Sequence, residues 1–178
     1  MHIYLARHGQ TNYNELGLCN ADPTVDVHLS EIGINQAIAL SDKLKMAVFE
    51  RVYISELRRT KQTAEYINKY HNAPVVVDDR LNDNRTGFEG KPVDEFYAAL
   101  SAATDKWTAR FNDGESLTDT KLRVKSFIDE LKTTGLDSVL IVTSMSIVQA
   151  FYGLVNNLSA QQAWDFQVHK GSCIELYI

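Results

Sequence analysis

Short apolar runs alternate along this chain with longer segments in which apolar residues recur at helical spacing. The runs that we predict to be strands are Ile3–Ala6, Val52–Ile54, Pro74–Val77, Ser138–Thr143 and Ile174–Ile178. Continuous apolar runs are typical of strands that are covered on both faces, and strand–helix alternation is typical of parallel sheets. The sequence therefore predicts an α/β fold, a three-layer α/β/α sandwich with a mainly parallel central sheet.

Four predicted helices connect these strands. Ser30 is expected to cap the first, because serine side chains accept hydrogen bonds from the free amides at a helix start, and Ser116 begins the third. The residues predicted to face the core are Ile34, Ala37, Ile38 and Leu44 in the first helix, Thr60, Thr63, Ala64 and Ile67 in the second, and Leu117, Val124, Phe127, Ile128 and Leu131 in the third. Residues 145–155 are almost wholly apolar, which indicates a buried fourth helix.

The length and composition favour one ordinary domain. With 178 residues, of which 44% are hydrophobic, the chain can bury a sizeable core, so we expect residues 1–178 to form a single domain. The segment from about residue 82 to residue 114 is irregular and rich in aromatic residues, which predicts a lid or a small cap. The aromatic residues Phe96, Tyr97, Trp107 and Phe111 are expected to pack this cap.

Charge and cysteine usage narrow the class of partner. The net charge of −5 disfavours a general nucleic-acid binder, which would need a basic face, so any anionic ligand must be held by a local cluster of positive groups. Cys19 and Cys173 are far apart and suggest neither a disulfide framework nor a zinc site. The opening apolar run is interrupted by Arg7 and His8 too early for a signal peptide or a membrane span. We therefore expect a cytoplasmic protein without a membrane partner.

Polar residues follow each of the first four predicted strands. Arg7 and His8 follow the first, Arg58 and Arg59 the second, Asp83 the third and Ser144 the fourth. In parallel sheets, ligands bind beyond the carboxyl ends of the strands. These side chains are therefore expected to meet at one edge of the sheet and to form a functional site.

His8 is the first candidate for chemistry at this edge. An imidazole can attack phosphorus as a nucleophile, the Arg7 guanidinium can grip phosphate oxygens, and Gly9 lets the backbone approach a ligand closely. A lone histidine after a strand is more often a packed or solvated residue, but its neighbours and the other strand-end groups favour function. No metal-ligand cluster surrounds it in the sequence, so neither a metal nor another cofactor is expected.

Five motifs, in this order, carry a resemblance to a known family. They are Arg7–Thr11 with Asn14, Leu29–Gly33 with Gln36 and Ala37, Ser55–Thr60 with Gln62–Ala64, Arg80–Asp83 ahead of Gly87 and Glu89-Gly90, and Gly114–Ser116 with Asp119 and Arg123. Over essentially its whole length the chain resembles the histidine phosphatase superfamily, also called the phosphoglycerate mutase-like family. The resemblance implies the phosphoglycerate mutase-like fold.

The resemblance also implies roles for individual residues. His8 would become a phosphohistidine, Arg7 and Arg59 would hold the phosphoryl oxygens, and Asn14 would orient the phosphate or line the pocket. Asp83 falls where many relatives have a glutamate that acts as general acid. Two alternatives stay open here: Asp83 caps a turn, or Glu89 is the acid, although the position of Glu89 matches a structural turn. Arg58 is expected to be a solvated helix charge.

The chain departs from the family pattern after the fourth predicted strand. Relatives have a second histidine there, in a Thr-His-Gly turn, whereas this chain reads Thr143-Ser144-Met145-Ser146. Either Ser144 replaces the histidine directly, or it replaces a His-Gly pair. Loss of one preorganised donor to a developing oxyanion costs about 3 kcal/mol of transition-state stabilisation. His169, just before the last strand, is the one other histidine considered as a substitute.

Three functions are compatible with these residues. The first is a phosphate-monoester hydrolase that acts through His8 with reduced activity. The second is a phosphate-ester-binding pseudoenzyme with a regulatory role, and the third is a mutase, for which the chain is short. All three predict a small phosphorylated molecule or inorganic phosphate as the ligand, held by Arg7, Arg59, Asn14 and Ser144.

Overall fold

A computed structural model describes all residues from 1 to 178 and contains one five-stranded sheet. The strands are β1 (His2–Arg7), β2 (Arg51–Ile54), β3 (Val75–Val77), β4 (Ser138–Thr143) and β5 (Cys173–Tyr177). Their order across the sheet is β3-β2-β4-β1-β5, and only β5 runs antiparallel to its neighbour. The predicted α/β fold with a mainly parallel sheet is therefore confirmed.

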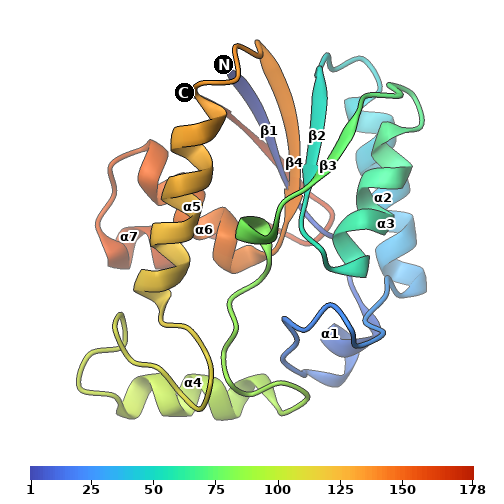
Figure 1. The fold of residues 1–178 in the computed structure, drawn as a ribbon. Coiled ribbons are helices and arrows are strands. Elements are labelled where there is room, and N and C mark those ends of the chain that lie inside the picture. The colour runs from blue at the N-terminus through green and yellow to red at the C-terminus, as the bar shows by residue number, and fades with distance from the viewer.

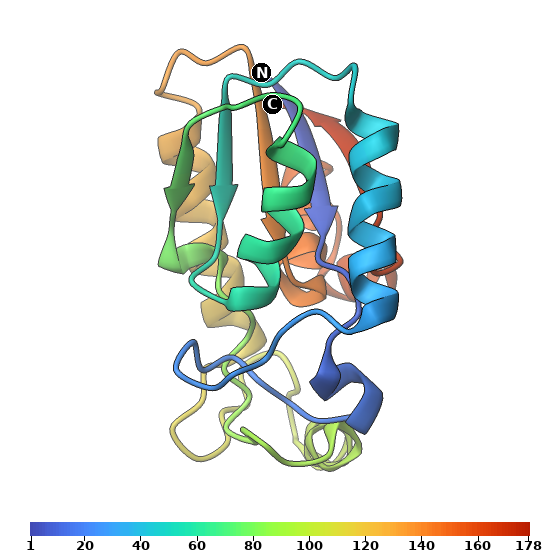
Figure 2. The same ribbon diagram turned by 90° about the vertical axis from the view of Figure 1, so that its right-hand side faces the viewer.

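Helices cover both faces of this sheet. They are α1 (Asn12–Leu16), α2 (Glu31–Leu44), α3 (Arg58–Asn68), α4 (Val93–Ala102), α5 (Leu117–Leu131), α6 (Met145–Val155) and α7 (Ala160–Asp165), with a 3-10 helix at Asp79–Leu81. Figure 1 shows α2 and α3 on one face and α5, α6 and α7 on the other. In Figure 2 the arrows of β1, β2 and β3 point toward the end of the sheet where α1 and α4 lie. None of the helices is long and apolar enough to cross a membrane.

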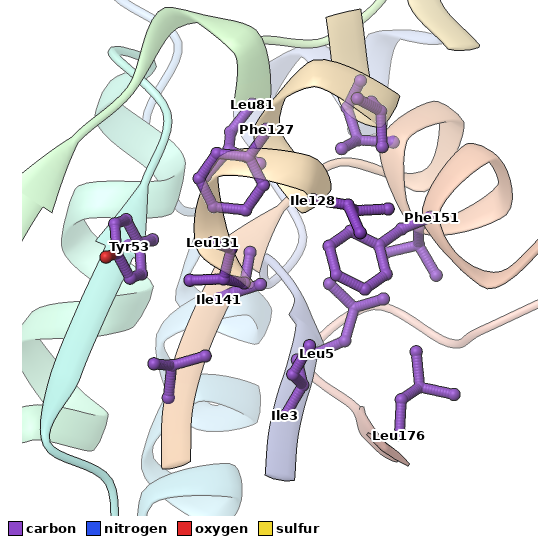
Figure 3. Close-up of a cluster of buried hydrophobic side chains, with 14 of the residues drawn as sticks. Ile3, Leu5, Tyr53, Leu81, Phe127, Ile128, Leu131, Ile141, Phe151 and Leu176 are labelled. Carbon is purple, nitrogen blue, oxygen red and sulfur yellow. The ribbon is translucent and has the colours of Figure 1, made fainter. Parts of the chain in front are cut away.

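Two hydrophobic clusters hold the three layers together. Figure 3 shows the larger one, in which Leu5 of β1 and Ile141 of β4 meet Phe127 of α5 and Phe151 of α6. On the opposite face, alternate residues of the same strands, such as Val142, pack against α2 and α3. Every residue of β4 is buried, which explains why this strand reads as a continuous apolar run. Full burial of a valine, leucine, isoleucine or phenylalanine side chain in these clusters stabilises the fold by about 1.5–3 kcal/mol.

The predicted core face of α2 needs one correction. Ile38 is 36% exposed, whereas Leu40, which the prediction omitted, is buried together with Ala37 and Leu44. Ala37, Leu40 and Leu44 follow the helical spacing of three and four residues, whereas Ile38 lies about 100° further around the helix. The N-cap prediction is confirmed, because the Ser30 hydroxyl accepts a hydrogen bond from the Gly33 amide at 3.2 Å.

Three short helices were not predicted. The most important is α4, because it lies in the segment 82–114 that we expected to be irregular. It begins after Pro92, and Phe96 and Leu100, one turn apart, pack against Cys19 in a small cluster of their own. The other two, α1 and α7, have only five and six residues, and a capping box at each N-terminus satisfies their free amides. Such short helices depend on caps and tertiary contacts, which sequence periodicity does not reveal.

Candidate active site

A cavity of about 670 Å³ opens at the carboxyl ends of the parallel strands. Five of the six predicted site residues line it: Arg7, His8, Asn14, Arg59 and Asp83. Ser144, the sixth, is buried beside them and contacts the Arg59 guanidinium. Helix α4 contributes Phe96 and Tyr97, two of the aromatic residues that were expected to pack a cap. The structure therefore brings the strand-end residues together at one edge of the sheet.

His8 is held as a neutral imidazole with one unprotonated nitrogen. The residue is 4% exposed, and its Nδ1 lies 2.6 Å from the Gly9 carbonyl oxygen. A carbonyl can only accept, so Nδ1 carries the proton and donates, which leaves the lone pair on Nε2. Burial, the Arg59 charge and the Arg7 charge lower the pKa of His8 to about 3, although the Gly9 bond opposes the shift. The imidazole is therefore ready to act as a nucleophile at neutral pH.

The backbone around His8 is clamped from two sides. A Cβ on Gly9 would lie 2.4 Å from the Gly33 carbonyl oxygen, so only glycine allows this close approach to the start of α2. On the other side, the Gly171 amide lies 3.1 Å from the Arg7 carbonyl oxygen and 3.0 Å from that of His8, and it donates to both. These contacts fix the end of β1 and hence the direction of the imidazole.

Arg59 is the centre of the hydrogen-bond network. The residue is 3% exposed, and its Nε donates to His8 Nε2 at 3.2 Å. Its Nη1 donates to the Asn20 side-chain oxygen at 2.9 Å, and its Nη2 donates to the Asn20 carbonyl at 2.9 Å and to Asp83 Oδ2 at 3.0 Å. A weaker contact of 3.4 Å joins Nη2 to Ser144 Oγ. One guanidinium thus links the nucleophile candidate to the general-acid candidate.

Asp83 is a carboxylate that the site keeps ionised. Burial raises its pKa, but the Arg59 charge, the Ser146 hydroxyl, His8 and the Asn84 amide together lower it below its ordinary value. Ser146 donates to Oδ1 at 2.5 Å, and the Asn84 amide donates to the same oxygen at 2.9 Å. The Asp83 side chain is 28% exposed, and the residue lines the cavity. This position allows a carboxyl group to reach a bound ligand.

Arg7 and Asn14 contribute further polar atoms to the cavity. Arg7 Nη1 donates to the Val168 carbonyl at 2.7 Å, whereas its buried Nε has no partner. Asn14 Oδ1 accepts a hydrogen bond from the Thr11 amide at 3.2 Å, as part of the capping box of α1. The guanidinium of Arg7 therefore keeps donors that an oxyanion could accept from.

Several candidates lie outside this constellation. Arg58 forms an ion pair with Asp26, and its side chain is 54% exposed. Glu89 does not line the cavity, and its Oε2 accepts a hydrogen bond from the Ala21 amide at 2.7 Å. His169 is exposed and does not line the cavity either, so His8 is the one histidine that does. Ser144 is the N-cap of α6 but makes no side-chain cap bond.

Three residues at the site were not predicted from the sequence. Asn20 orients Arg59, but it lies in a loop without any pattern that could have identified it. Lys170 lines the cavity in the loop after α7, and burial and the nearby Arg7 charge lower its pKa. Ser146 had a usable signal, because a hydroxyl in the first turn of a helix that follows a site strand points toward the same edge.

Comparisons with known proteins agree with this geometry. The family model of the histidine phosphatase superfamily (branch 1) matches residues 3–178. Among curated proteins, the chain is 27% identical to putative phosphoserine phosphatase 2 of Hydrogenobacter thermophilus, over 99% of this chain and 89% of the relative. It is 30% identical to the adenosylcobalamin/alpha-ribazole phosphatase of Salmonella typhimurium, over 96% of this chain and 87% of the relative.

Solved structures show the same similarity. The alpha-ribazole phosphatase from Shigella flexneri superposes with a TM-score of 0.88 at 26% identity, covering 100% of this chain and 91% of that one. A mycobacterial glucosyl-3-phosphoglycerate phosphatase in complex with VO3 gives a TM-score of 0.85 at 25% identity, over 99% and 90% of the two chains.

Proposed function

The chain belongs to branch 1 of the histidine phosphatase superfamily, and on this premise we propose that it hydrolyses phosphate monoesters through a phosphohistidine at His8. One observation carries the proposal: Arg59 donates to the unprotonated Nε2 of His8 and, from the same guanidinium, to Asp83. A phosphoryl group bound at Arg59 would therefore lie between a nucleophile and a carboxyl group. The phosphatase names of the relatives support the same reaction class.

Substrate binding comes first in the proposed reaction. The phosphate oxygens accept hydrogen bonds from Arg7 and Arg59, which are positioned as charge-assisted donors. When phosphate takes up the Nη donors of Arg59, the Arg59–Asp83 ion pair weakens and the pKa of Asp83 rises. Asp83 can then accept the proton that a phosphate monoanion brings into the cavity.

Two displacements at phosphorus follow. His8 Nε2 attacks with its lone pair, the bond between phosphorus and the ester oxygen breaks, and Asp83 gives its proton to that oxygen. In the second step Asp83, again a carboxylate, accepts a proton from water while the water oxygen attacks the phosphohistidine. Asp83 returns this proton to inorganic phosphate, which leaves as the monoanion, and the neutral imidazole is restored. Ser146 and the Asn84 amide hold the Asp83 carboxylate in both steps.

Ser144 determines how fast this reaction runs. We place it where the family has its second catalytic histidine, a donor to the phosphoryl oxygens as charge develops. A serine hydroxyl is shorter and uncharged, so turnover is expected to be about a hundredfold to a thousandfold lower than with the histidine. The same observation favours a second candidate function, a pseudoenzyme that binds phosphate esters and regulates a partner. Residues 82–114 form the cap over the site in both proposals.

A trapping experiment separates these two functions. The protein is mixed with a radiolabelled aryl phosphate and quenched in base, and the acid stability of the protein-bound phosphate is measured together with its position. A hydrolase gives acid-labile phosphate on His8, which the His8→Ala variant lacks. Tight vanadate binding without phosphohistidine and without turnover would identify the pseudoenzyme instead.

A further inference from the structure

A second cavity, of about 200 Å³, lies beside the first, between α5, α6 and α7. Four residues face both cavities: Leu117, Ser146, Gln149 and Trp164. These four residues, called the partition below, border both spaces. The second cavity therefore adjoins the site of the proposed reaction and is not a separate surface feature.

The shape of the second cavity suits one ring or a short chain. Its floor consists of the small residues Ala150, Gly153 and Ala163, and Gly153 keeps α6 so close to α7 that a Cβ there would lie 2.5 Å from the Ala163 Cβ. The rings of Trp107 and Trp164 form a wall, with centroids 6.2 Å apart at 84°. An apolar protein cavity of about 150 Å³ is large enough to bind benzene.

Four of the polar side chains around this cavity are already engaged, whereas the exposed Lys121, which also lines it, has no side-chain partner. Ser146 donates to Asp83, Thr118 donates to the Trp107 carbonyl, Thr120 bonds to Ser116 and Asn84, and the Gln149 amide nitrogen donates to the Trp164 and Phe166 carbonyls. A polar ligand group that entered would lose its water hydrogen bonds without gaining these partners, which costs free energy. An apolar occupant meets no such penalty.

The position of Asp83 shows which part of a substrate would come here. Its partner Ser146 is one of the residues in the partition, so the general acid stands on the side of the second cavity. A general acid must reach the ester oxygen of the leaving alcohol. The alcohol therefore departs on this side, next to the partition.

We infer that the second cavity receives the apolar part of the leaving alcohol, so that the substrates are phosphate monoesters whose alcohol carries an alkyl chain or an aromatic ring. The inference rests on the proposed function, because that function assigns Asp83 as the general acid. Binding in this cavity would give the protein its substrate preference, because Arg7, His8 and Arg59 contact only the phosphoryl group, which all phosphate monoesters share.

A homologous series of n-alkylphosphonates, from methyl to hexyl, tests the inference by calorimetric titration of the intact protein. These compounds carry a carbon–phosphorus bond that phosphatases of this mechanism do not hydrolyse, so binding is measured without turnover. Each methylene that enters the cavity should lower Kd about fourfold. Hydrolysis of the matching alkyl phosphates is measured in parallel, and kcat/KM should rise in the same steps.

Variants that fill the second cavity show whether the alkyl chain of the ligand binds there. Ala150→Leu on the cavity floor should abolish the dependence on chain length and leave the Kd of methylphosphonate within twofold of the original value. Because Ala150 also packs against the core, Ala160→Leu at the exposed start of α7 is a second filling variant. Ala98→Leu on α4 is the matched control, because Ala98 is exposed and lines neither cavity.

The outcomes separate this inference from the proposed function. If methylphosphonate binds but Kd does not change with chain length, the inference is overturned and the proposed phosphate site stands. A chain-length dependence that survives in both filling variants also overturns it. A dependence that both variants abolish supports binding of the alkyl chain in this cavity, and absence of hydrolysis in that case removes the hydrolase function together with the leaving-group role of that chain. If no phosphonate binds, both proposals fail.

Discussion

Arg59 and Asp83 form an ion pair, with Nη2 and Oδ2 3.0 Å apart, at the carboxyl end of the sheet. The same guanidinium donates to His8 at 3.2 Å, so the charge that acts together with burial to keep the imidazole neutral also keeps the carboxyl group ionised. Any anion that binds Arg59 competes with Asp83 for its donors. The protonation state of the acid is thereby linked to occupancy of the phosphate site.

His8→Ala is expected to lower phosphatase turnover by about 10⁴-fold or more, because it removes the group that forms the covalent bond. The fold should persist, because His8 lines a polar cavity at a strand end and lies outside the hydrophobic clusters. Steady-state turnover and circular dichroism check the two halves of this prediction. Unchanged turnover in the folded variant would show that His8 is not the nucleophile.

Asp83→Asn should slow hydrolysis most for esters with poor leaving groups. An alkoxide needs a proton as it departs, so a loss of about 10²–10³-fold is expected for alkyl phosphates, whereas nitrophenolate leaves with little help. Glu89→Gln is the matched control, because Glu89 does not line the cavity, and it should affect both substrates equally. Equal losses for both substrates in Asp83→Asn would indicate a structural role only.

Acid should destabilise the protein through His8. The pKa of His8 is about 3 in the folded state and 6.5 for the free group, so between these values the unfolded chain binds a proton that the folded chain does not. The free energy of unfolding therefore decreases as pH falls below 6.5, by about 1.4 kcal/mol per pH unit from this residue.

Urea denaturation at pH 7.5 and pH 5.0 measures this contribution. The original protein should lose about 2 kcal/mol more than His8→Ala over this interval. The comparison cancels the contributions of the other titratable groups, which both proteins share. Equal losses in the two proteins would mean that His8 titrates normally in the folded state.

Arg59→Lys should weaken vanadate binding at least about tenfold, since one ammonium cannot replace a planar guanidinium that bonds His8, Asn20 and Asp83 at once. Arg58→Lys, at the neighbouring exposed position, should leave the affinity within twofold. Calorimetric titration at one fixed ionic strength gives both values. The assignment of Arg59 fails if the two variants bind vanadate equally.

Ser144→His should raise kcat about tenfold or more with little change in affinity, because it restores a donor used in the transition state. Ser144 has φ −99°, which any residue adopts, and its Oγ already contacts Arg59, so we expect direct replacement to suffice. Replacement by His-Gly would shift Ser146 away from Asp83 and should gain less. Ser144→Ala, which supplies no donor, is the comparison variant and should not raise kcat.

The absence of any gain in kcat would also identify what limits the rate. If neither histidine variant accelerates hydrolysis although both bind vanadate, the missing donor does not limit the rate. The geometry of the Arg59–Asp83 pair would then be the next candidate for the limiting feature.

The amino-acid sequence by itself determined the layered α/β fold and the edge at which the site forms. Apolar runs such as Ser138–Thr143 indicate buried strands because both faces of β4 are covered, and parallel strands bring their carboxyl ends together wherever the loops lead. For this reason the sequence alone predicts that Arg7, His8, Arg59 and Asp83 meet, and all four line one cavity.

Only the tertiary structure decided how these groups interact. The bond from Arg59 to Asn20 joins residues 39 positions apart, and that from Ser146 to Asp83 joins residues 63 apart. Such contacts depend on the paths of loops and on short helices such as α4, which long-range packing stabilises and which leave no periodic pattern in the sequence. The neutral state of His8 and the ionised state of Asp83 also depend on tertiary structure, because burial and charges within a few ångströms set pKa values and sequence neighbours alone do not.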